Sequence, residues 1–134
     1  MHLQSLQSMD AIPQETAAQF SKSWIATQEF FAALIDQTGF DNLIPLYIFI
    51  QQFKRAGEDK HFRSGILMQD LIISRSIGSI LRQDQKFIRI KARDNSFVVT
   101  LRDNKKMFKE YTIKDLKDER FTELLQLLKD TLID

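Results

Sequence analysis

The spacing of apolar residues changes along this chain, and that change limits the fold more than any other feature. Between residues 14 and 37, mainly apolar side chains recur at three- and four-residue steps, as in Phe20, Trp24, Thr27, Phe31 and Leu34. This spacing gathers them on one face of a helix. Between residues 86 and 113 the period falls to two, which is typical of strands. Helices followed by an antiparallel sheet predict an α+β domain.

Two more segments carry helical signals. The apolar residues 43–50 continue into a polar stretch that ends at Gly57, so we expect a helix over residues 43–56 with Pro45 in its first turn. A C-terminal helix opens at Asp115 or Asp118. Its apolar stripe consists of Phe121, Leu124, Leu125, Leu128 and Leu132.

The β region consists of three predicted strands. Residues 86–92, 97–101 and 107–113 alternate or are rich in β-branched side chains, and Asp-Asn pairs at 94–95 and 103–104 supply turns between them. We therefore expect a three-stranded antiparallel meander between about residues 86 and 113.

Residues 62–83 have two interpretations. As one long helix, they place Ile66, Ile73, Ile77 and Ile80 on one face. Alternatively, they form two helices, over residues 65–71 and 74–83, and Ser74 is the N-cap of the second helix. The adjacent Ile72 and Ile73 are poor helix-interior residues, because β-branching restricts χ1, and they favour the break.

Length and composition predict one domain. The chain has 134 residues, 43% of them hydrophobic, which suffices for one core over residues 14–134 after a loose tail at 1–13. The absence of cysteine excludes disulfides and thiolate metal sites. The longest apolar run, residues 43–50, is too short to span a bilayer, and no leader pattern opens the chain. These features predict a cytoplasmic protein without membrane contact.

Charge is distributed unevenly. Residues 1–50 carry one basic and five acidic residues, residues 51–112 carry fourteen basic and seven acidic, and residues 113–134 carry four basic and six acidic. A basic middle is compatible with an anionic partner. The alternative is that these lysines and arginines only solvate the outer face of the sheet.

Catalytic signals are few, and we expect a protein that is not an enzyme and needs no cofactor. The two histidines, His2 and His61, have no metal-ligand spacing, and His61 is expected to be a solvated loop residue. No glycine-rich phosphate loop or nucleophile elbow is present. Glu58 and Lys60 match half of a metal-dependent nuclease site, in which carboxylates hold the cation, and they leave a small nuclease as an alternative.

One pattern extends over three neighbouring segments, residues 72–83 (IISRSIGSILRQ), 86–92 (KFIRIKA) and 96–101 (SFVVTL). This pattern resembles the winged helix-turn-helix superfamily. The resemblance covers residues 62–102 and implies a winged-helix-like middle over residues 43–102. The support helix would be 43–56, the second helix 65–71, the recognition helix 74–83 and the wing 86–101.

This resemblance implies a nucleic-acid-binding module. A helix from Ser74 would expose Arg75, Ser76, Ser79 and Arg82, which can donate to phosphates or read base edges. The hairpin would add backbone contacts from Lys86, Arg89, Lys91 and Arg93. The alternative function is a protein-interaction or assembly subunit that docks through its sheet or terminal helices. A homo-oligomer is compatible with that alternative.

Overall fold

The computed structural model describes residues 12–78, 84–103 and 106–133 and confirms the α+β class. Its α-helices are α2 (Gln14–Ile35), α3 (Ile44–Arg55) and α4 (Glu119–Lys129), with short 3-10 turns η1 (Asp41–Leu43) and η2 (Glu58–Lys60). All three lie where helices were predicted. Pro45 occupies the first turn of α3, and Gly57 follows its end with a φ of 82°.

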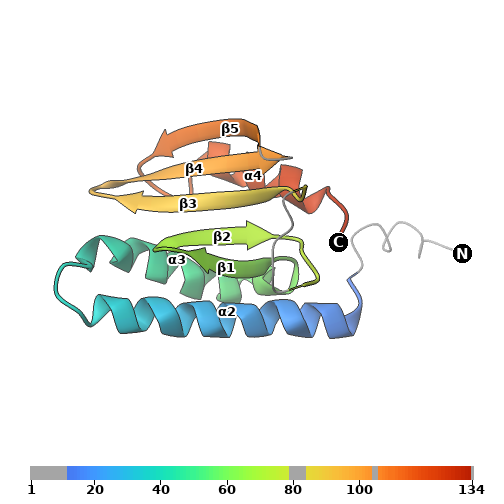
Figure 1. Ribbon diagram of the computed structural model, residues 1–134, viewed down its shortest axis with the longest axis horizontal. Helices are drawn as coiled ribbons and strands as arrows, with labels where there is room; N and C mark the ends of the chain where they lie inside the picture. The colour runs from blue at the N-terminus through green and yellow to red at the C-terminus, as the bar shows by residue number, and fades with distance from the viewer. Residues whose placement is uncertain (1–11, 79–83, 104–105, 134) are drawn as a thin grey trace, which may run out of the picture.

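The sheet is a five-stranded antiparallel meander in the order β1-β2-β3-β4-β5 (Figure 1). Its strands are β1 (Arg63–Leu67), β2 (Asp70–Ser74), β3 (Phe87–Arg93), β4 (Ser96–Asp103) and β5 (Lys106–Ile113). The three strands predicted between residues 86 and 113 are confirmed as β3, β4 and β5. The sheet has two more strands than the sequence predicted.

The helices predicted between residues 62 and 83 are wrong over residues 63–74, which form the β1–β2 hairpin. Every residue of β2 is buried, and its three middle residues 71–73 are all apolar, so the strand shows no alternation with a period of two. The hairpin turn is equally hard to recognise, because Met68 takes a φ of 60°, a conformation in which glycine is usual. Ser74 ends β2, and residues 79–83 of the predicted recognition helix lie outside the described residues.

The core lies between the helices and one face of the sheet. Ile88 and Ile90 of β3 and Val99 and Leu101 of β4 point into it and are almost completely buried. Three helices cover them with Trp24, Phe31, Leu46, Ile50, Phe53, Phe121, Leu124 and Leu128. The alternate residues of β3 and β4 therefore face the opposite side of the sheet.

Polar side chains of α2 bind the backbone at the start of the edge strand β1. The Trp24 indole Nε1 donates to the Phe62 carbonyl at 2.8 Å, and the Ser64 amide donates to Ser23 Oγ at 2.9 Å. Thr27 Oγ1 and Ser64 Oγ share a hydrogen bond of 2.7 Å. We call this set of contacts the α2–β1 seam. It provides partners for edge backbone groups that have no neighbouring strand.

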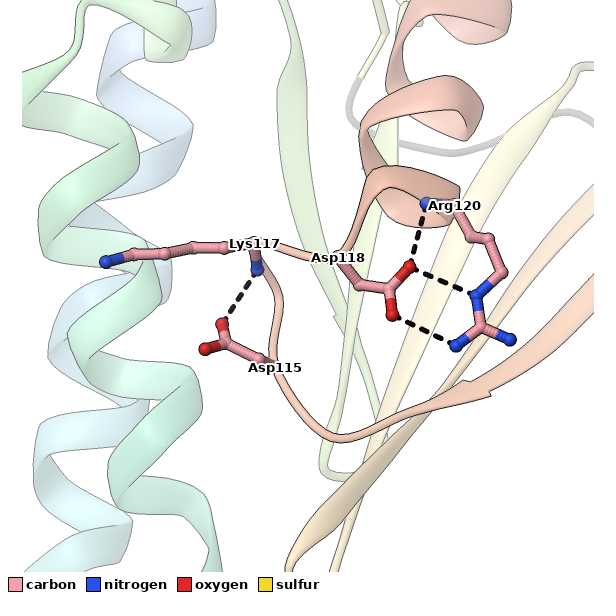
Figure 2. A network of polar contacts seen from close by, with 4 residues as sticks. All are labelled: Asp115, Lys117, Asp118 and Arg120. Carbon is pink, nitrogen blue, oxygen red and sulfur yellow. Dashed lines mark hydrogen bonds and ion pairs between the residues drawn. The ribbon is translucent and has the colours of Figure 1, made fainter.

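The α4 helix begins at an N-cap that also binds the first-turn arginine. The Asp118 carboxylate accepts from the Arg120 amide at 2.9 Å and from the Arg120 guanidinium at 3.0 and 2.9 Å (Figure 2). The guanidinium lies 5.6 Å from the centre of the Tyr111 ring on β5. The side-chain hydrogen bond from Arg120 lowers the pKa of Asp118 to about 2.

The α2–β1 seam predicts that Trp24→Phe destabilises the folded protein. This change leaves the buried Phe62 carbonyl without its donor and removes one ring from a fully buried side chain, so we expect a loss of about 1–3 kcal/mol in the free energy of unfolding. Urea unfolding followed by circular dichroism measures it. Ile25→Ala is the control on the same helix, since Ile25 is 50% exposed and should cost less than about 0.5 kcal/mol. Equal losses in the two variants would contradict the role of the seam.

The N-cap predicts a pH dependence. The pKa of Asp118 in the folded protein lies near 2, below its ordinary value of 3.8. The contribution of its carboxylate to folding stability is therefore complete above about pH 4 and is lost as the pH falls toward 2. Asp118→Asn should therefore have a smaller fall in Tm over this interval than the unmodified protein. Thermal unfolding by circular dichroism at a series of pH values tests it, with Glu119→Gln as the neighbouring control. Parallel pH curves for Asp118→Asn and the unmodified protein would refute the assignment.

Candidate functional site

The outer face of the sheet carries a row of basic side chains on β3 and β4. Arg89, Lys91 and Arg93 are successive outward residues of β3, and the register places Arg89 opposite Thr100 and Lys91 opposite Val98. Arg102 extends the same outward row of β4. We call these four residues the basic face. With Val98, Thr100 and Glu110 they line a shallow hollow of about 180 Å³.

The charges of the basic face are only partly neutralised. Arg89 Nε donates to Asp70 Oδ2 at 2.6 Å, and Thr100 Oγ1 donates to Glu110 Oε1 at 3.1 Å. Lys91 and Arg93 are exposed and form no ion pair within the described residues. Lys91 and Arg93 therefore leave positive charge on this face that an anionic ligand can meet.

A second hollow adjoins the basic face where the β1–β2 turn meets α2. It has a volume of about 610 Å³ and shares Arg89 and Lys91 with the first hollow. Its apolar part includes Phe30, which is 38% exposed, and Met68, which is 80% exposed. We call it the hairpin hollow. An aromatic ring, a thioether and two cations therefore lie along one continuous surface.

The structure brings three of the eight predicted binding residues together. Arg89, Lys91 and Arg93 share the basic face, as the hairpin prediction required. Lys86 is exposed but lies elsewhere, in a hollow that also contains the carboxyl groups of Asp84, Asp103 and Asp130. Ser79 and Arg82 lie outside the described residues.

The prediction that Arg75 and Ser76 stand on an exposed helix face is wrong. Arg75 is 6% exposed, donates to the His61 carbonyl at 3.0 Å and lies over the Phe62 ring. Ser76 is 3% exposed, and its Oγ donates to the Gly78 carbonyl at 2.9 Å. Both side chains bind backbone carbonyl groups and are buried, because residues 74–78 end β2 and leave it without forming a helix.

The residues considered for catalysis form no recognisable centre. Glu58 and Lys60 lie on η2, and the Glu58 carboxylate is 3.8 Å from Lys129 Nζ of α4. Among the described residues, no group of three or more metal-ligating side chains is close enough to hold an ion. His61 is half-buried rather than solvated, and its Nδ1 has no hydrogen-bond partner in the described part of the chain.

Sequence reasoning missed Arg102, Phe30 and Met68 as site residues. Arg102 could have been found, since residues 97–101 were predicted to form a strand and Arg102, which follows it, lies two residues after Thr100 on the same face. Phe30 and Met68 gave no such signal, because their proximity depends on how α2 crosses the β1–β2 hairpin.

Comparisons with protein-family models, with curated proteins and with solved structures find no match to this chain. Within residues 12–78, 84–103 and 106–133, no helix combines the length and apolar content needed to cross a membrane.

The ion pair at the border of the two hollows predicts a measurable stability effect. Asp70 is nearly buried, and its partner Arg89 is about 30% exposed, so Asp70→Asn should cost about 1 kcal/mol by weakening a charge-assisted hydrogen bond. Asp94→Asn, in the exposed β3–β4 turn, is the matched control with an expected change under about 0.5 kcal/mol. Urea unfolding at low and at high salt measures both. An Asp70→Asn cost that does not fall with added salt would argue against an electrostatic origin.

Proposed function

We propose that this chain is a non-enzymatic binding module that holds single-stranded nucleic acid against the outer face of its sheet. The observation that carries the proposal is the alignment of Arg89, Lys91, Arg93 and Arg102 on one open surface. The proposal keeps the basic hairpin predicted from the sequence and uses no recognition helix.

The spacing of the cations suits an extended phosphate backbone. Outward residues on one strand are about 6.7 Å apart, because each residue advances about 3.3–3.4 Å. Arg89, Lys91 and Arg93 therefore offer donors at regular intervals along β3, and Arg102 adds one from β4. Lysine and arginine at such intervals bind phosphates and release condensed counterions.

The hairpin hollow supplies the second element of single-strand recognition. Single-strand binders combine a basic track with aromatic rings on which bases stack. Phe30 is partly exposed beside Arg89 and Lys91, and Met68 extends the same apolar surface. A strand whose phosphates follow the basic face could place a base against this ring.

A single strand fits this surface better than a duplex does. Sequence-specific reading of duplex DNA most often uses an α-helix that enters the major groove. The three described α-helices cover the core side of the sheet, away from the basic face. A nearly flat strand face instead accommodates splayed bases and an extended backbone.

Fluorescence anisotropy with labelled single-stranded RNA, single-stranded DNA and duplex DNA tests the proposal. We expect micromolar binding to the single strands that weakens between about 50 and 200 mM salt. Lys91→Ala/Arg93→Ala should weaken binding about tenfold or more and reduce the salt slope by about 1.4, the value for two phosphate contacts to a single strand. Phe30→Leu should weaken binding about fivefold or more through lost stacking.

The matched control is Lys22→Ala/Arg55→Ala, which removes one lysine and one arginine from exposed positions on α2 and α3. Its binding should stay within about twofold of the unmodified protein, because two distant surface charges add little to a local contact. Equal losses in the two double variants would show general charge attraction and refute the site.

The second candidate function is protein docking, which the exposed side chains of Phe30, Leu67 and Met68 favour. It predicts no salt-dependent affinity for nucleic acid in the same experiment. Absence of binding at about 50 mM salt would therefore reject the first proposal and leave this apolar surface as the better candidate.

A further inference from the structure

A groove on the core side of the sheet lies between α3 and the segment that joins β5 to α4. Its volume is about 450 Å³. One wall is α3, with Ile48, Phe49, Phe53 and Ala56, and the other is the segment 114–117. Phe97, which is buried and points toward the core, also lines it. The groove is therefore separate from the basic face, which lies on the opposite side of the sheet.

The lining of the groove is mainly apolar. Ile48 is 44% exposed on the outer side of α3, and Ile44 lies one turn earlier with 39% of its surface exposed. Phe49 packs edge-on against Phe121 of α4 with the ring centres 5.5 Å apart, which joins this wall to α4. An apolar groove of this volume with few polar groups is the usual form of a small-molecule site.

Two lysines stand at the edge of this apolar surface. Lys114 and Lys117 line the groove, and neither forms an ion pair with a described residue. Figure 2 shows the Lys117 side chain extending from its loop toward α3. The carboxylate of Asp115 is turned to the backbone, where it accepts from the Lys117 amide at 2.8 Å. The edge of the groove thus carries two ammonium groups and one carboxylate, and that carboxylate is already hydrogen-bonded to the backbone.

We propose that this groove binds a free medium- or long-chain fatty acid, with its chain against α3 and its carboxylate at Lys114 and Lys117. The apolar wall supplies the surface that an alkyl chain needs, and the lysines supply the complementary charge. This site does not depend on the nucleic-acid proposal, because the two share no residue.

Isothermal titration calorimetry with dodecanoate and dodecanol, both below their aggregation concentrations, tests the proposal. The acid should bind more tightly than the alcohol by about threefold or more, because only the acid pairs with the lysines. Across a series of shorter fatty acids, affinity should rise up to about fourfold for each added methylene, the fold-change that corresponds to burial of one CH₂. Equal affinities of dodecanoate and dodecanol would overturn the role of the lysines.

Variants locate the site. Lys114→Gln/Lys117→Gln should remove the preference for the acid over the alcohol, whereas Lys91→Gln on the basic face should leave it unchanged. Ala56→Trp should abolish binding of both ligands by filling the groove, and Ala56 is exposed at the end of α3, so the fold should tolerate the change. Unchanged binding to Ala56→Trp, when circular dichroism shows it folded, would refute the groove as the site. No heat of binding, together with no shift of Tm at millimolar dodecanoate, would refute the proposal itself.

Discussion

The α2–β1 seam is the constraint on which the remaining structure depends. Through Ser23, Trp24 and Thr27, one helix binds the backbone and side chain at the start of the first strand, so the position of the sheet edge is fixed relative to the helices. Because the strands then follow in sequence order, fixing the first strand fixes which face of each later strand meets the core. The same contacts cover an edge that could otherwise pair with another chain.

The basic face arises from the alternation of inward and outward side chains in β3 and β4. Ile88 and Ile90 enter the core, so Arg89 and Lys91 must face the other way. A slip of one residue in this register would bury the arginines and expose the isoleucines, at a large cost in free energy. Packing therefore determines where the charge of the basic face lies. The groove beside α3 is a different case, because it depends on a helix and a loop that meet only in the folded chain.

Prediction from the sequence succeeded where one face of an element is polar. The helices at 14–35 and 119–129 and the strands from 87 to 113 have this amphipathic pattern, whereas the helix at 44–55 was predicted from its polar end and Gly57. It failed at β1 and β2, because β2 is buried on both faces and the turn at Met68 has neither glycine nor asparagine at its left-handed position. Because this segment is not a helix, Arg75 and Ser76 were wrongly predicted to be exposed. The positions of Arg89, Lys91 and Arg93 on the β3–β4 hairpin were predicted correctly, because the alternation of β3 is visible in the sequence.

The meander topology also determines the order in which contacts can form. Each strand pairs with its neighbour in sequence, and the β1–β2 and β3–β4 pairings close turns of two residues at a small entropic cost, whereas residues 75–86 join β2 to β3. The seam is different, because its hydrogen bonds join residues 37 to 41 positions apart. In a folding reaction the hairpins can therefore assemble before α2 docks onto β1. Whenever α2 is detached from β1, the Phe62 carbonyl and the Ser64 amide lose their partners, and this edge becomes open to pairing with another chain.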